Sequence, residues 1–112
     1  MVDILVGFSG SSDDIRKVLS ADLPIKVSDE NVGIEGDDIQ IDVSVKQIQK
    51  AEVDAFVQAI VDLFPEKNMI GLAQYDFEKA ELFKYVYQNR ELSTYKCIGV
   101  KKSTGEHVFE RV

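Results

Sequence analysis

The stretch Lys50–Phe64, KAEVDAFVQAIVDLF, predicts the central helix of the fold. Its apolar residues recur at steps of three and four, so they form one stripe along a helix, and polar residues occupy the other side. Pro65 ends the helix, because its ring clashes with the preceding turn and it has no N–H. Such a stripe requires a sheet to cover it. The residues of the stripe are Val53, Phe56, Val57, Ile60, Leu63 and Phe64.

The segments around this helix have the patterns of strands and of one further helix. Val2–Phe8 is a short apolar run of strand length, which predicts a buried strand, and serines 11 and 12 can cap a helix directly after it. Apolar and polar residues alternate on both sides of the turn Glu35–Asp38, which predicts a β-hairpin with one dry and one wet face. Met69–Tyr75 predicts a fourth strand.

The predicted order over residues 1–76 is strand, helix, strand, strand, helix, strand, which is similar to the βαββαβ order of ferredoxin-like sandwiches. Phe77–Asn89 combines helix-forming and strand-forming residues; we expect a helix there, with a strand as the alternative. Thr94–Lys102 and His107–Val112 flank a turn that contains Gly105, which predicts a C-terminal β-hairpin. We therefore expect a single α+β domain over residues 1–112, an antiparallel sheet with helices on one face.

The formal net charge of −7 is carried entirely by the first part of the chain. Residues 1–45 contain ten acidic and three basic residues, whereas ten acids balance ten bases from Lys46 onward. The acidic part would repel nucleic acid, so we expect no nucleic-acid binding. The run Met1–Phe8 includes Asp3 and is too short for a signal core or a membrane span, and the lone Cys97 suits a reducing compartment. We therefore expect a cytoplasmic protein that does not bind membranes.

One loop has a composition that could bind a phosphate. Gly7–Ser12 lies between a predicted strand and a predicted helix, where backbone N–H groups can hold an anion. No lysine follows its glycines, their spacing is not that of a dinucleotide motif, and Asp13 and Asp14 would repel the anion. A helix cap is the favoured interpretation.

Two other patterns could suggest a metal site or a catalytic pair. From Asp29, oxygen ligands recur on alternate residues as in a calcium loop, but the sixth position is Ile34 instead of glycine and the twelfth is Gln40 instead of glutamate. Cys97 and His107 could meet on paired strands as a nucleophile and a base, but no orienting group or oxyanion device accompanies them. We therefore predict no catalytic residue, no metal site and no cofactor.

Two features favour a protein-binding surface. Between Asp29 and Asp42 there are six acids and no base, which indicates either a solubility device at a sheet edge or a recognition surface for a basic partner. All four tyrosines lie between Tyr75 and Tyr95, and those outside the core could anchor an interface. The predicted partner-binding residues are Asp29, Glu30, Glu35, Asp37, Asp38, Asp42, Tyr85 and Tyr87.

These observations lead to two hypotheses from different classes. The first is a non-enzymatic binding protein, a monomer or weak dimer, that neutralises a basic protein partner. Bacterial toxin-immunity proteins are a class of this type, because blocking a cationic nuclease requires only complementary charge and shape. The alternative is a ferredoxin-like regulatory domain that binds a small ligand at Ser9–Ser12.

Overall fold

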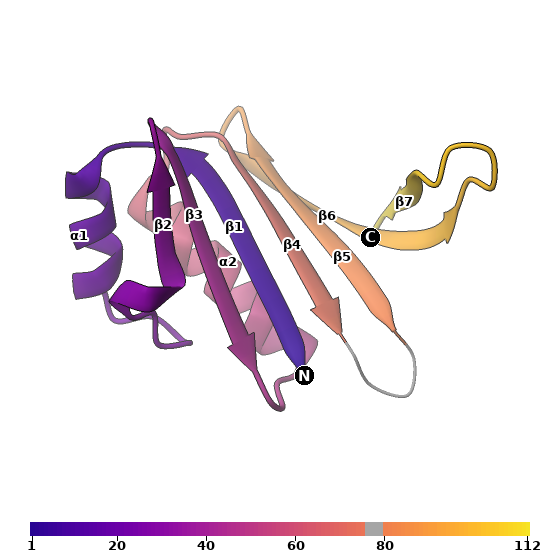
Figure 1. Cartoon of the computed structure of the whole chain (residues 1–112), viewed down its shortest axis with the longest axis horizontal. Coiled ribbons are helices and arrows are strands. Elements are labelled where there is room, and N and C mark those ends of the chain that lie inside the picture. The colour runs from indigo at the N-terminus through magenta and orange to yellow at the C-terminus, as the bar shows by residue number, and fades with distance from the viewer. Residues whose placement is uncertain (76–79) are drawn as a thin grey trace.

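The computed structural model describes residues 1–75 and 80–112, which form an α+β fold with a seven-stranded antiparallel sheet and two α-helices. The strands lie in the order β2-β3-β1-β4-β5-β6-β7 (Figure 1). The elements are β1 (Val2–Ser9), α1 (Ser12–Ser20), the 3-10 helix η1 (Asp29–Asn31), β2 (Val32–Glu35), β3 (Asp38–Val45), α2 (Lys50–Leu63), β4 (Met69–Tyr75), β5 (Glu81–Gln88), β6 (Glu91–Val100) and β7 (His107–Arg111).

The predicted central helix is α2, and its apolar stripe covers the middle of the sheet. Val53, Phe56 and Ile60 have no exposed surface, and α2 lies behind β3, β1 and β4 in Figure 1. Burying this stripe removes apolar surface from water, which is the main force that holds the helix to the sheet. Helix α1 lies at the β2 side of the sheet, and its Lys17 Nζ donates a hydrogen bond of 2.8 Å to the Leu63 carbonyl at the end of α2.

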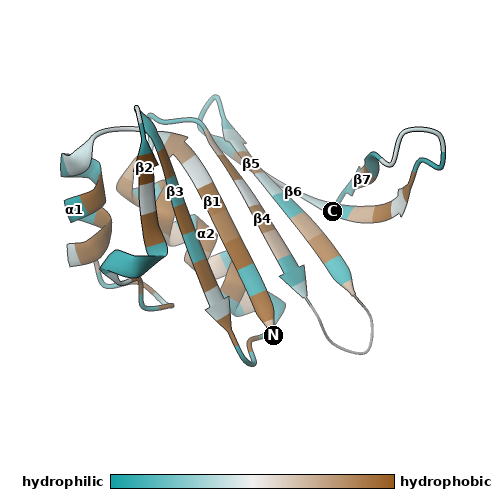
Figure 2. Ribbon diagram, viewed as in Figure 1, coloured by the Kyte–Doolittle hydropathy of each residue, from teal (hydrophilic) through white to brown (hydrophobic). Residues whose placement is uncertain are grey.

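Alternation along the strands gives the sheet two different faces. On β1, Ile4 and Val6 are buried against the helices, whereas Asp3, Leu5 and Gly7 point to the other side. We call that other side the open face, because both helices pack on the opposite one. Figure 2 shows the same alternation of apolar and polar residues along β3. The prediction of a buried strand at residues 2–8 is therefore corrected: β1 is buried on one face only.

The helix expected over Phe77–Asn89 is wrong within the described residues, because Glu81–Gln88 is strand β5. Residues 76–79 lie outside the described part of the chain. Phe83, Tyr85 and Tyr87 alternate along β5 and point into the core, so the period of two prevails over the helix-forming residues before it. Pairing with β4 also satisfies the backbone groups of that strand.

The turns join neighbouring strands where the backbone adopts positive φ. Gly36 (φ 63°) lies in the β2–β3 turn and Gly105 (φ 74°) in the β6–β7 turn, as expected for glycine at such positions. Asn89 (φ 52°) and Arg90 (φ 62°) make a two-residue turn between β5 and β6 that the sequence did not reveal. The predicted C-terminal hairpin is confirmed, and it extends away from the helices (Figure 1). No helix in the described part of the chain is long and apolar enough to cross a membrane.

Candidate functional site

The open face of the sheet has an apolar centre that neither helix covers. Leu5 on β1 pairs with Leu72 on β4, and Ile70 pairs with Val86 on β5. Ile70 is 56% exposed and the other three are half-buried. The alternation of these residues with the buried residues of β1, β4 and β5 is visible in the sequence and could have predicted this surface.

Two of the hollows on this face lie on either side of the Leu5–Leu72 pair. The first has a volume of about 400 Å³ and lies above Gly7, between Gln40, Ile70 and Val86. The second has a volume of about 380 Å³ and lies above Asp3. Both are open to solvent on one side, so neither is an enclosed cavity.

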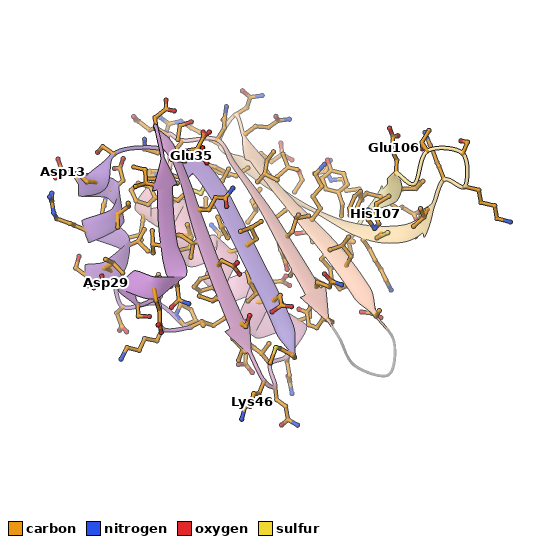
Figure 3. All side chains as sticks on the ribbon, in the orientation of Figure 1. Asp13, Asp29, Glu35, Lys46, Glu106 and His107 are labelled. Atoms are coloured by element: carbon orange, nitrogen blue, oxygen red, sulfur yellow. The ribbon has the colours of Figure 1, made fainter. Side chains whose placement is uncertain are left out.

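The structure places the six predicted acids at three sites, and all six are exposed. Glu35 pairs with Asp38 across the β2–β3 turn, with Asp37 between them, so these three form one cluster, which we call the acidic tip. Asp42 lies on the open face, paired with Leu5. Asp29 and Glu30 lie in η1 at the other end of β2, and Figure 3 shows Asp29 and Glu35 at opposite ends of that strand.

The start of α1 lies beside the acidic tip and carries two acids, both of which are in ion pairs. The Gly10 N–H donates a hydrogen bond of 2.8 Å to the Asp37 carbonyl, which ties the tip to the loop that precedes α1. Asp13 at the start of the helix forms an ion pair with Arg16, and Asp14 lies 3.5 Å from Lys67 Nζ. None of the ion pairs between described residues includes an acid of the acidic tip, so its charges remain uncompensated.

Tyr85 and Tyr87, expected as interface anchors, lie in the core. They are 1% and 6% exposed, and they point towards the helices. The Tyr85 hydroxyl donates a hydrogen bond of 2.5 Å to Asp54 Oδ1 on α2, and the Tyr87 hydroxyl donates to the Pro65 carbonyl. Burial and the bond to Asp54 raise the pKa of Tyr85. A partner that docks on the folded protein would not touch either ring, whereas Tyr95, on the open face of β6, is half-exposed.

The expected loop Gly7–Ser12 is shorter in the structure, because Gly7–Ser9 belong to β1 and Ser12 begins α1; Ser11 is the N-cap residue of that helix. The Asp14 carboxylate accepts a hydrogen bond of 2.9 Å from the Ser11 N–H. This bond, together with the nearby ammonium of Lys67, lowers the pKa of Asp14. An anion at this helix terminus would have to displace a carboxylate that already occupies one of its N–H groups.

The remaining candidate residues do not converge. Cys97 pairs with Phe109, whereas His107 pairs with Val100, so the thiol and the imidazole are not cross-strand neighbours. The Asn31 side chain binds Ser28 and the Asp42 carbonyl, which separates it from the acids of the acidic tip. Among the described residues, no group of three or more His, Cys, Asp or Glu side chains has the arrangement of a metal site.

Comparison with known proteins gives no match, either to a family model, to a curated protein or to a solved structure.

Proposed function

We propose that this chain is a non-enzymatic binding protein that neutralises a basic protein partner through the acidic tip and the adjoining open face. The observation that carries the proposal is the position of the three uncompensated acids of the tip, Glu35, Asp37 and Asp38, at the border of an uncovered apolar surface. Interfaces commonly combine such an apolar centre with a charged rim that selects the partner.

Electrostatics supports a basic partner over a neutral one. Ten of the thirteen charged residues in residues 1–45 are acidic, and the Asp42 and Asp38 side chains extend this charge onto the open face. Repulsion among the acids of the tip is relieved when a basic surface approaches, so their charge favours association more than folding. The bases Lys101, Lys102 and Arg111 lie on the β6–β7 hairpin at the far end of the sheet.

A toxin-immunity inhibitor in the bacterial cytoplasm is the specific class that we propose. An inhibitor of a cationic nuclease has to cover a basic surface, and it needs no catalytic group or cofactor. The acidic tip and the open face supply the charge and the contact area for this task.

We further infer that the described part of residues 1–76, which ends at Tyr75, forms a ferredoxin-like unit. Its support is the order β2-β3-β1-β4 of the first four strands, in which β3 lies between β2 and β1 and is antiparallel to both. Many unrelated functions occur on that fold, so it does not by itself favour a small-ligand domain. The alternative ligand site at Ser9–Ser12 is less favoured because Asp14 occupies the Ser11 N–H.

Co-expression with the product of a neighbouring gene that encodes a basic domain tests the proposal. We expect the chain to form a stoichiometric complex with that domain and to restore growth to cells that express it. The matched control replaces three acids, Glu52→Gln and Asp62→Asn on α2 and Glu66→Gln in the loop that follows it, and should still protect, because α2 lies on the opposite side of the sheet from the open face and Glu66 pairs with Arg90 (Figure 1). Failure to form a complex with any such product would refute the proposed function.

A further inference from the structure

Gly7 lies in the middle of a central strand, where the fold itself does not require glycine. A Cβ atom added at Gly7 would lie 3.8 Å from the Ile39 carbonyl oxygen and 3.9 Å from that of Ile70, which are ordinary contacts. Its φ is not positive, unlike those of Gly36 and Gly105. Glycine weakens a strand interior, and it often marks a place where another molecule approaches closely.

Gly71, on the neighbouring strand, has closer neighbours than Gly7. It points to the helix face, and a Cβ atom there would lie 3.4 Å from the Cβ of Tyr85. This distance is the lower limit of ordinary van der Waals contact, so Tyr85 leaves little room for a side chain at Gly71. Gly7 has no side-chain neighbour within 4 Å of an added Cβ atom, and it forms part of the floor of the hollow of about 400 Å³.

The lining of this hollow suits a long cationic side chain. Ile70 and Val86 form an apolar wall, and Asp38 contributes a carboxylate at the end nearest the acidic tip. The amides of Gln40 and Gln88 offer acceptor oxygens on opposite sides of the hollow. An anion would be repelled by Asp38, and a purely apolar side chain would leave these polar groups unpaired.

We propose that the hollow above Gly7 receives an arginine side chain of the basic partner. This inference rests on the proposed function and deepens it, because it names the residue type and the place where it docks. The methylene stem lies along Ile70 and Val86, and the guanidinium group donates to Asp38 and to the amide oxygen of Gln40, which lie on the same face of β3. Guanidinium fits better than ammonium because its donors point in several fixed directions, as the acceptors around this hollow require.

Nuclear magnetic resonance titration with N-acetyl-arginine amide tests this site without the partner. We expect the backbone amide signals of Gly7, Gln40 and Val86 to shift. N-acetyl-citrulline amide has nearly the same shape without the charge, and it should bind about tenfold more weakly because it cannot form charge-assisted hydrogen bonds. Asp38→Asn should reduce the affinity for the arginine probe to that of the citrulline probe.

Gly7→Val places a branched side chain on the floor of the hollow, where it blocks the arginine stem and should abolish the shifts, while the protein keeps an equal or higher melting temperature, since the open face has room for the side chain. Ser93→Val is the matched control: Ser93 pairs with Val86 in the same row but does not line the hollow, and arginine binding should persist.

Three results would overturn the inference. The first is equal shifts from the arginine and citrulline probes. The second is shifts that Gly7→Val leaves unchanged, for example shifts confined to the acidic tip; this would remove the hollow as a docking site while leaving the proposed function intact. The third is the appearance of the same shifts on concentrating the protein alone, which would show that a second copy of this chain occupies the hollow.

Discussion

Replacing Tyr85 by alanine should destabilise the fold rather than weaken binding to a partner. The ring is 1% exposed and packs between the sheet and α2, so its removal leaves a cavity in the core. Removal of a fully buried aromatic ring costs about 3–5 kcal/mol. Since domains of this size have unfolding free energies of about 5–15 kcal/mol, the variant should lose a large share of its stability.

The hydroxyl and the ring of Tyr85 can be separated by a second variant. Tyr85→Phe removes only the hydrogen bond to Asp54, which should cost about 1 kcal/mol. Asp54 is not left as a buried unpaired charge, because its carboxylate is 42% exposed and Lys50 Nζ lies 3.0 Å away. Most of the loss in Tyr85→Ala should therefore come from the ring.

Urea denaturation followed by circular dichroism measures these differences. Tyr95→Ala is the control, since Tyr95 is half-exposed on the open face, and its loss should stay below about 1 kcal/mol. The reasoning would be refuted if Tyr85→Ala lost less than about 1 kcal/mol while dissociation of the partner became faster, because the ring would then belong to the interface.

Three further outcomes are expected. Phe56→Ala should lower the free energy of unfolding by about 3–5 kcal/mol in urea denaturation, because the ring has no exposed surface; a loss below about 1 kcal/mol would mean that α2 does not cover the core. Burial, with Asp54 and Glu81 nearby, raises the pKa of Tyr75 from 10.0 to about 12. Its contribution to stability is complete below pH 10 and is lost as the pH rises towards about 12, so Tyr75→Phe should flatten this fall when unfolding is measured across that range; an unchanged slope would contradict it. Millimolar calcium or zinc should leave the melting temperature unchanged, because Asp29 and Glu35 lie at opposite ends of β2; a rise of several degrees would contradict this.

The sequence predicted those elements whose local pattern is unambiguous. Lys50–Phe64 has a helical period and a proline stop, and Met69–Tyr75 became β4 with the predicted ends. The helix predicted for Phe77–Asn89 is wrong over Glu81–Gln88. Helix-forming residues precede a strand pattern in this segment, and the pairing of β5 with β4 selects the strand. The composition of a segment does not specify which strand it will pair with.

The candidate site was predictable in charge but not in shape. The acids between residues 29 and 42 are exposed as expected, but only the topology shows that β2 separates Asp29 and Glu30 from the acidic tip. The tyrosine cluster was informative about the core instead of the surface, because Tyr85 and Tyr87 alternate with Lys84 and Val86 along one strand. The sequence predicted Gly7 as the first residue of a loop, whereas it lies within β1.

Association kinetics measures the role of the acidic tip most directly. The variant Glu35→Gln, Asp37→Asn, Asp38→Asn is compared with the natural chain in stopped-flow binding to the basic partner. The two ionic strengths are about 0.01 M and about 0.15 M, where the Debye length is about 30 Å and about 8 Å. We predict that the variant folds normally and associates about tenfold more slowly at the lower ionic strength, with a much weaker dependence on salt. An association rate and salt dependence equal to those of the natural chain would contradict the proposal, and the acidic tip would then serve only solubility.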